Sequence, residues 1–317
     1  MEKVKMNPPI CFSSDGIGAV RIDNVPFFDV SKVFDCGQCF RFDPVSDTSH
    51  EAEYAGCAFG KYISVAQDGD TLYVYNTTAE EYEQVWKLFL SLDTDYGEIN
   101  RKLLSLSEQQ ALFDAVGASS GIRILRQDSW ETLCSFILSQ NNNIPRIKGL
   151  VASLCKRCGT PVDLSGMDRH IADIHRDRDG NFYSFPTPDK LSELGISGLY
   201  DLKTGFRAKY LYDASEKIMS GEVSLPFIDR ADTADATEHL MQIKGIGPKV
   251  ASCVLLFGFG KLDAFPVDVW IKKALKKYFD SSFSPEALGE FAGVAQQYLF
   301  YYERYLQGNA SVKGATT

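Results

Sequence analysis

The chain has 317 residues, of which 44% are hydrophobic and 24% are charged, and its formal net charge is −9. This length and composition predict about two globular domains and exclude a largely disordered, collagen-like or coiled-coil protein. No apolar run approaches the length of about 18 residues that a membrane helix requires, and the first residues lack the apolar run of a secretory signal, so we expect neither feature.

The first hundred residues predict an antiparallel sheet. Runs rich in β-branched and aromatic residues at 18–22, 39–42, 53–57, 62–65 and 71–75 are separated by Asp-Pro, Gly-Lys and Asp-Gly-Asp turn signals. The gaps between them are too short for crossover helices, so neighbouring strands must be antiparallel. After residue 78 the hydrophobic period becomes helical, over 80–92 and 99–106.

The rest of the chain is predominantly helical in its pattern. Helices are predicted at 109–116, 129–138, 143–157, 187–193, 209–220, 234–241, 248–256, 269–278 and 285–306, with a loop-rich insertion at 163–185 and a frayed tail from 308. The fold class is therefore α+β. We expect an N-terminal antiparallel β-sheet domain over 1–120, packed on a mostly α-helical domain over 121–317.

The eight cysteines indicate reduced thiols in an intracellular compartment, which we expect to be a bacterial cytoplasm or a nucleus. Two pairs have CxxC spacing, Cys36 with Cys39 and Cys155 with Cys158. A zinc site built from both pairs is one interpretation, but the pairs are far apart and the second lies in a helical pattern. Buried or incidental cysteines are the favoured interpretation, and we predict neither a metal nor a cofactor.

Positive charge is concentrated in two stretches of this acidic chain. Residues 141–160 contain four basic residues and no acidic one, and residues 241–279 contain seven lysines and two aspartates. Two basic stretches in an acidic chain suit a protein that contacts a polyanion through a limited face. Solvated lysines on a helix flank are the alternative for 272–277.

The most specific segment spans residues 240–251. One helix runs into Gly245-Ile246-Gly247, and a second helix starts with Pro248 in its first turn, where a missing N–H has no consequence. The two glycines allow a sharp turn and a close approach to another group. The free N–H groups at the start of the second helix suit a phosphate, although an ordinary turn between helices is the alternative for this segment alone.

This segment resembles the hairpin of the helix-hairpin-helix DNA glycosylases, and specifically of the 8-oxoguanine DNA glycosylase/lyases. Lys249 stands where bifunctional members carry their catalytic lysine, and Pro266-Val267-Asp268-Val269 matches the motif of their catalytic aspartate. A partly buried amine at the positive end of a helix is less stable when charged, and the neutral amine is a nucleophile. A phosphate-binding Lys249 and a simple N-cap at Asp268 are the alternatives. The resemblance covers roughly residues 30–306.

The resemblance also implies residues that contact the DNA backbone and the base opposite the lesion. Asn141 begins an Asn-Asn-Asn-Ile motif, and Arg146 and Arg207 correspond to arginines that the family directs at the unpaired cytosine. Phe206 stands where many members have a tyrosine wedge that fills the gap left by the extruded base; a core aromatic is its alternative. The set comprises Asn141, Arg146, Phe206, Arg207, Gly245, Gly247, Val250 and Trp270, of which Trp270 departs from the family's usual histidine.

Base recognition is implied at four further positions. Gly37 lies in Gly-Gln-Cys-Phe, which resembles the family's Gly-Gln-Ser-Phe, and in the family this glycine carbonyl accepts a hydrogen bond from the N7–H of 8-oxoguanine. Cys253 lies one helical turn after Lys249 and hence beside it. By resemblance, Cys253 and Phe300 sandwich the flipped purine, while Gln296 binds its Watson–Crick edge. Without the motif, Phe300 would be interpreted as a core aromatic.

The resemblance implies a bifunctional DNA glycosylase and lyase of base excision repair. It would excise 8-oxoguanine opposite cytosine from double-stranded DNA through Lys249 and then cleave the strand by β-elimination, acting as a monomer. Two alternatives stay open, a glycosylase for another damaged base and a non-enzymatic helix-hairpin-helix DNA-binding module. Monofunctional glycosylases lack the lysine, and a binding module needs no lysine–aspartate pair. No cysteine follows Cys253, so the iron–sulfur loop of the endonuclease III branch is absent.

Overall fold

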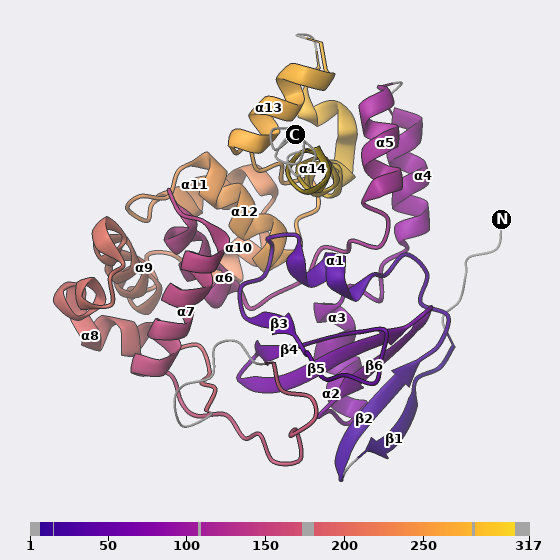
Figure 1. Ribbon diagram of the computed structural model, residues 1–317. Coiled ribbons are helices and arrows are strands. Elements are labelled where there is room, and N and C mark those ends of the chain that lie inside the picture. Colours follow the sequence, from indigo (N-terminus) through magenta and orange to yellow (C-terminus); the bar gives the residue numbers. More distant parts are fainter. Residues whose placement is uncertain (1–6, 15, 107–108, 173–180, 281–282, 308–317) are drawn as a thin grey trace, which may run out of the picture.

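The computed structural model describes residues 7–14, 16–106, 109–172, 181–280 and 283–307. Its N-terminal part is a six-stranded sheet in the order β1-β2-β6-β5-β4-β3, with every pair antiparallel (Figure 1). The strands are β1 (Ile10–Ser14), β2 (Ile17–Ile22), β3 (Phe42–Pro44), β4 (Ala52–Ala58), β5 (Lys61–Asp68) and β6 (Thr71–Tyr75). The predicted α+β fold is confirmed, although edge strand β1 was not predicted.

The strand predicted over 39–42 is wrong except at its last residue. Helix α1 (Val30–Asp35), which the sequence analysis missed, starts after Asp29, whose carboxylate accepts a hydrogen bond from the Lys32 N–H at 3.0 Å. A bend follows, with Gly37 at a φ of +84°, and β3 starts only at Phe42. The apolar and aromatic residues over 39–42 are therefore largely buried in a loop and, apart from Phe42, do not pair as a strand.

The two faces of the sheet are covered differently. On one face, Ile63 and Val65 of β5 pack against Trp86 of η1 (Tyr82–Trp86) and Phe89 of α3 (Lys87–Phe89), which follow the short α2 (Ala79–Glu81). The helix predicted over 80–92 thus contains a π-helical turn. Alternate residues of β5, such as Tyr62, face the other way and pack against the predicted loop-rich insertion. That insertion is irregular where it is described; residues 173–180 lie outside the described part.

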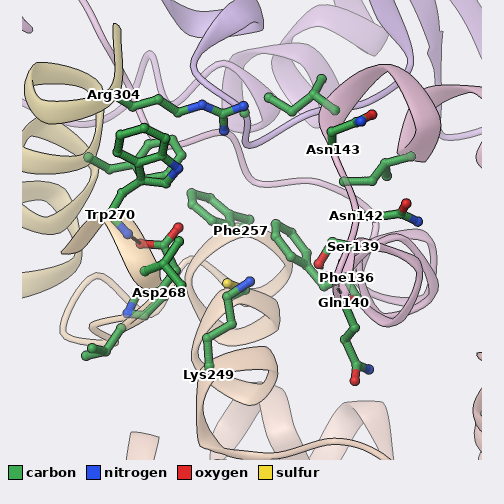
Figure 2. A pocket seen from close by; sticks show the side chains of 18 of the residues that line it. Phe136, Ser139, Gln140, Asn142, Asn143, Lys249, Phe257, Asp268, Trp270 and Arg304 are labelled. Atoms are coloured by element: carbon green, nitrogen blue, oxygen red, sulfur yellow. Dashed lines mark hydrogen bonds between the residues drawn. The ribbon is translucent and has the colours of Figure 1, made fainter. Parts of the chain in front are cut away.

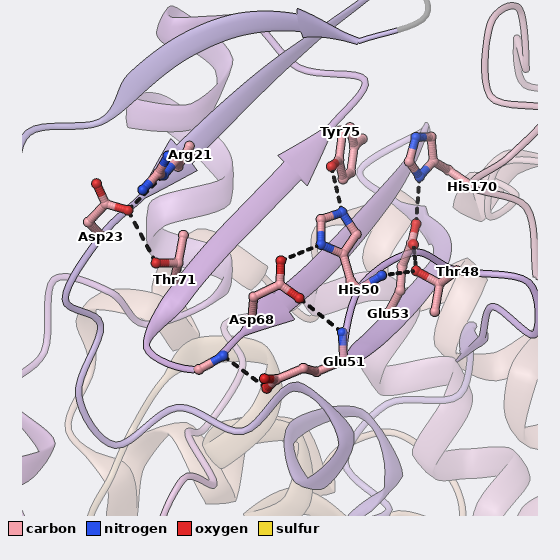
Figure 3. A network of polar contacts seen from close by, with 11 residues as sticks. Arg21, Asp23, Thr48, His50, Glu51, Glu53, Asp68, Thr71, Tyr75 and His170 are labelled. Carbon is pink, nitrogen blue, oxygen red and sulfur yellow. Dashed lines mark hydrogen bonds and ion pairs between the residues drawn. The ribbon is translucent and has the colours of Figure 1, made fainter.

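Polar groups gather where the insertion crosses this second face (Figure 3). Glu53 of β4 is buried and binds His170 of the insertion, with 2.7 Å between Oε1 and Nδ1, and it also accepts hydrogen bonds from Thr48 and Ser64. The His170 ring stacks on Tyr75 with 4.0 Å between centroids. The insertion is therefore attached to the sheet through a buried carboxylate whose oxygens all have partners.

Helices form most of the remaining described part, and α6, α12 and α14 are buried along most of their length. The elements are α4 (Tyr96–Leu106), α5 (Gln110–Ala118), α6 (Ser129–Ser139), α7 (Ile144–Cys158), α8 (Pro188–Asp201), η2 (Gly205–Arg207), α9 (Ala208–Ser220), α10 (Leu225–Arg230), α11 (Thr233–Met241), α12 (Pro248–Phe259), α13 (Val269–Tyr278), η3 (Pro285–Phe291), α14 (Ala292–Tyr301) and η4 (Tyr302–Gln307). The tail predicted to fray from 308 lies outside the described residues.

Two ion pairs connect the region of β3 to helices α6 and α7. The Lys148 ammonium of α7 lies 2.6 Å from an Asp43 carboxylate oxygen of β3, and the Arg41 guanidinium lies 3.0 Å from the Glu131 carboxylate of α6. All four side chains are largely removed from solvent. Within the described part of the chain, no helix has the length and apolar character needed to cross a membrane.

Candidate active site

A cavity of about 600 Å³ opens between the hairpin helix α12, the end of α6, the start of α13 and helix α14. The loop after α1 completes its wall with Gly37. Eight of the residues predicted to act in catalysis or binding line this cavity: Gly37, Asn141, Lys249, Cys253, Asp268, Trp270, Gln296 and Phe300. The structure thus brings together residues that are separated by more than 250 positions in the sequence.

Lys249 extends from the first turn of α12 into the cavity (Figure 2). Its Nζ lies 5.7 Å from the centroid of the Phe136 ring, which belongs to α6. Cys253 lies one turn further along α12 and is buried. Burial raises the pKa of the Cys253 thiol, and the Lys249 ammonium opposes this by its charge and by hydrogen bonding, while the Asp268 carboxylate adds to the rise. Lysine, cysteine and aspartate are therefore electrostatic neighbours.

Asp268 is the N-cap of α13. Its Oδ1 accepts hydrogen bonds from the Trp270 N–H at 2.9 Å and the Ile271 N–H at 2.8 Å. These bonds fix the carboxylate at the cavity, near Lys249 (Figure 2). The N-cap interpretation is therefore correct, and it is compatible with an electrostatic role at the same place.

The two glycines of the hairpin between α11 and α12 differ in their surroundings. Gly245 has a φ of +79°, and a Cβ there would lie 2.4 Å from ring carbons of Tyr210 in α9. Gly247 is the N-cap of α12, and a Cβ there would meet no atom within 4 Å. The start of α12 therefore has no side-chain cap, and its N–H groups suit an anionic ligand. The Val250 side chain is buried, so only its backbone can take part.

Much of the cavity wall is apolar, and Gln296 and Gln297 of α14 place amide groups beside it. Phe136 and Phe257 stack with 5.5 Å between centroids, and Phe40 and Phe300 line the same space. Gln296 is 4% exposed, and its Oε1 has no hydrogen-bond partner among the described residues. A buried amide oxygen without a partner destabilises the protein by about 1–3 kcal/mol, which a bound donor would recover. The arrangement suits a flat aromatic ligand with an N–H edge.

The residues predicted to contact the opposite base lie beside the cavity and, apart from Asn141, do not line it. Arg207 is buried and donates hydrogen bonds to the carbonyl oxygens of Gln140, Asn141 and Thr204. It thereby holds the asparagine turn, in which Asn141 has a φ of +49°. Phe206 is 44% exposed, so the core interpretation of this aromatic is wrong. Arg146 is exposed on the first turn of α7.

Sequence reasoning missed several residues that line the cavity. They include Phe40, Phe136, Phe257, Lys272, Gln297 and Arg304. Arg304 follows Phe300 by four positions, and its guanidinium lies 5.4 Å from the Phe300 ring centroid, so helical spacing could have suggested it. The phenylalanines carry no such signal, because an apolar residue facing a cavity has the same periodicity as one in the core. No group of three or more potential metal ligands occurs in the described ranges.

Comparisons with known proteins identify matching families over most of the chain. The model of the 8-oxoguanine DNA glycosylase N-terminal domain matches residues 20–133, and that of the HhH-GPD superfamily base excision DNA repair protein matches residues 134–288. A crystal structure of Clostridium acetobutylicum 8-oxoguanine glycosylase/lyase, in complex with double-stranded DNA containing cytosine opposite to 8-oxoguanine, is 35% identical. The match covers 95% of this chain and 99% of that chain, with a TM-score of 0.82.

Two curated relatives are similar over shorter regions. The N-glycosylase/DNA lyase of Saccharomyces cerevisiae is 35% identical over 54% of this chain, and the match spans 45% of the yeast protein. The probable N-glycosylase/DNA lyase of Methanothermobacter thermautotrophicus is 29% identical over 72% of this chain and 75% of its own length. The chain therefore spans less than half of the yeast relative and three quarters of the archaeal one.

Proposed function

The chain belongs to the 8-oxoguanine DNA glycosylase/lyase family, and on that premise we propose that it is a bifunctional base excision repair enzyme. It excises 8-oxoguanine opposite cytosine and then cleaves the DNA strand at the abasic site. The observation that carries the proposal is the cavity itself, in which Lys249, Cys253 and Asp268 lie together and Gln296 presents an unpartnered buried oxygen.

The proposed first step is nucleophilic. The neutral Lys249 amine attacks C1′ of the extruded nucleotide, and the bond between C1′ and the base breaks, so that the base leaves with the bonding electron pair. Positive charge develops on the sugar as this bond breaks, and the Asp268 carboxylate stabilises it electrostatically. Asp268 is suited to this role because two backbone N–H groups fix one of its oxygens at the rim of the cavity.

The second step is β-elimination. One amine proton goes to the departed base, and the other goes to O4′ as the C1′–O4′ bond breaks and the nitrogen lone pair forms the C=N bond of a Schiff base between Lys249 and C1′. Removal of a proton from C2′ then lets the electron pair of that bond form a double bond as the C3′–oxygen bond breaks, and the strand is cleaved. Hydrolysis of the Schiff base releases Lys249. The chain needs no metal or redox cofactor in this scheme.

Recognition of the extruded base is assigned to the apolar end of the cavity. Cys253 and Phe300 contact the two faces of the purine, Gln296 binds its Watson–Crick edge, and the Gly37 carbonyl accepts the N7–H. The apolar lining and the unpartnered oxygen of Gln296 support this assignment. An extruded base contacted in this way is separated from its neighbours in the duplex.

The duplex itself is assigned to the surface beside the cavity. Phe206 fills the gap left by the extruded base, and Asn141, Arg146 and Arg207 contact the opposite cytosine. Backbone groups at Gly245, Gly247 and Val250, together with Trp270, contact the DNA backbone. The exposure of Phe206 supports the wedge, and the uncapped start of α12 supports the phosphate contact. We propose that the chain acts as a monomer on double-stranded DNA in a bacterial cytoplasm or a nucleus.

The test is borohydride trapping. The protein is incubated with a duplex carrying one 8-oxoguanine opposite cytosine, with and without borohydride, beside Lys249→Gln. Lys102→Gln is the matched control, because this exposed lysine of α4 pairs with Glu290 and does not line the cavity. We expect wild type and Lys102→Gln to form a covalent adduct with the DNA and Lys249→Gln to form none.

Each alternative outcome identifies a different error. Base loss revealed by alkali without an adduct would mean a monofunctional enzyme, in which Lys249 is not the nucleophile. An adduct with Lys249→Gln as strong as with wild type would move the nucleophile to another amine. Neither adduct nor base loss with wild type would refute 8-oxoguanine as the substrate and leave the other damaged bases to be tested.

A further inference from the structure

We propose that Gln297 is a positioning residue that fixes the Gly37 carbonyl and thereby sets the preference for 8-oxoguanine over guanine. The inference rests on the proposed function, because it concerns how the same cavity distinguishes the damaged base from the normal one. Gln297 lies next to Gln296 in α14 and both line the cavity, but the two side chains differ in their hydrogen-bond partners.

The two neighbouring glutamines differ in their partners. The Oε1 of Gln296 has no partner among the described residues, whereas the Nε2 of Gln297 donates a hydrogen bond of 2.9 Å to the carbonyl oxygen of Cys36. Gln297 is 2% exposed and Cys36 is fully buried. Because this bond joins groups 261 positions apart and is removed from water, it holds the loop after α1 against α14.

The loop is held on its other side as well. The carbonyl oxygen of Gln38 accepts a hydrogen bond of 2.8 Å from the Gln127 side chain. The Gln38 amide is buried and makes three bonds of its own, to the carbonyl oxygens of Val33 and Arg123 at 2.9 and 2.8 Å and from the Leu125 N–H at 2.9 Å. The residues before and after Gly37 therefore both have hydrogen-bonded carbonyl groups.

Gly37 is the exception between them. It lines the cavity with a φ of +84°, and the described residues provide no donor for its carbonyl oxygen. One unpartnered acceptor thus lies between two occupied ones, in a residue type with wide conformational freedom. The peptide groups on either side determine where this acceptor points, and the Gln297 bond fixes one of them.

The chemistry of the bases explains why this orientation matters. 8-Oxoguanine carries a hydrogen on N7, whereas guanine has an acceptor lone pair there. A fixed carbonyl oxygen therefore attracts the N7–H of 8-oxoguanine and repels the N7 lone pair of guanine. Hydrogen bonds weaken steeply once the donor angle falls below about 120°. If the Cys36 carbonyl loses its partner, the adjoining peptide group can rotate, and the difference between the two bases decreases.

The experiment measures binding selectivity in the Lys249→Gln background, which prevents turnover of the substrate. Dissociation constants are measured for three duplexes that carry 8-oxoguanine, guanine or a tetrahydrofuran abasic analogue opposite cytosine. Gln297→Met keeps the side-chain length and removes the donor. Gln297→Glu is the second variant, because a carboxylate also cannot donate. Val294→Ala is the control, because Val294 is buried in α14 and does not line the cavity.

We expect both Gln297 variants to lose about 5- to 10-fold of the preference for 8-oxoguanine over guanine, the effect of weakening one buried hydrogen bond. Affinity for the abasic analogue should change by no more than about twofold, because that ligand has no base to distinguish. Val294→Ala should lower the melting temperature and leave the preference intact.

Three results would overturn the inference. The first is an unchanged preference in both variants while the parent prefers 8-oxoguanine. The second is an equal loss of affinity for all three duplexes, which would show that Gln297 only supports the fold. The third is a parent that does not distinguish 8-oxoguanine from guanine, which would refute the proposed substrate and this inference with it.

Discussion

Replacing the two hairpin glycines by alanine should separate folding from DNA binding. At Gly245 an alanine would have to adopt a φ of +79°, which destabilises an L-residue by about 1–2 kcal/mol. Its Cβ would also lie 2.4 Å from the Tyr210 ring, and relief of such overpacking costs about 1–3 kcal/mol more. The sum is about 2–5 kcal/mol, or about 3–7 °C in the melting temperature of a chain of 317 residues.

Gly221 provides the matched control for the strain. It ends α9 with a φ of +76°, and a Cβ there would meet no atom within 4 Å. Gly221→Ala should therefore lower the melting temperature by about 1.5–3 °C, the effect of the backbone conformation alone. The difference between the two variants measures the contact with Tyr210, and Tyr210→Ala in the Gly245→Ala background should recover part of it.

Gly247→Ala should behave in the opposite way. Its φ of −105° suits any residue and its Cβ would have open space, so the melting temperature should change by less than about 1.5 °C. The added methyl group would lie at the uncapped start of α12, where a phosphate must approach the N–H groups. We expect affinity for a duplex with a tetrahydrofuran site to fall about tenfold, equivalent to about 1.4 kcal/mol.

Thermal unfolding, monitored by circular dichroism, measures the melting temperatures. Fluorescence anisotropy with a labelled duplex measures the DNA affinities. Equal melting temperatures for Gly245→Ala and Gly221→Ala would refute the steric argument at Tyr210. Unchanged DNA affinity for Gly247→Ala would refute the assignment of a phosphate to the start of α12.

Two further predictions concern stability and thiol reactivity. Burial raises the pKa of Glu53, but hydrogen bonds from His170, Ser64 and Thr48 outweigh it and leave the pKa below the usual 4.5; its stabilising effect is therefore complete above that pH and lost as the pH falls. The gap in unfolding free energy between wild type and Glu53→Gln should narrow below pH 4.5, and a constant gap would contradict the assignment. In native protein at pH 8, iodoacetamide should modify the exposed Cys11 before any buried cysteine. The reason is that burial raises the pKa of the buried thiols, those of Cys36, Cys39, Cys57, Cys134, Cys155 and Cys253. Peptide mass mapping tests this, and modification of any buried cysteine before Cys11 would mean that the cavity or core opens readily.

The sequence predicted the fold well where one local rule governs an element and less well where a distant contact governs it. The strand at 71–75 and the helix at 269–278 have the bounds that alternation and an N-cap aspartate indicate. The helix predicted over 285–306 is divided instead, because Gly289 has a φ of +61° and cannot continue a helix, and because a π-helical segment begins at Tyr302. Apolar periodicity does not report either break.

The residues around the loop after α1 show the same limit more sharply. The run Cys39-Phe40-Arg41-Phe42 is rich in apolar and aromatic residues as a strand would be. Cys39 and Phe40 nevertheless lie in an irregular segment, because the buried Gln38 amide binds three backbone groups at 33, 123 and 125. Two of these partners are more than 80 positions away. A window of sequence around Gln38 contains no information about them, so a run of apolar and aromatic residues was interpreted as a strand.

The candidate site could be predicted in proportion to how local its parts are. Lys249 was assigned from the resemblance of the single segment that contains it, and helical spacing places Cys253 one turn beyond it. Gln296 and Gln297 are the opposite case, because they are identical and adjacent, and only the motif singled out the first. Successive residues of an α-helix point about 100° apart. Both amides line the cavity, but Gln297 donates to the Cys36 carbonyl, whereas the Gln296 oxygen has no partner among the described residues. Two adjacent residues of α14 are thus proposed to have different roles, Gln296 in binding the base and Gln297 in positioning the Gly37 carbonyl. Only the packed structure distinguishes these two glutamines.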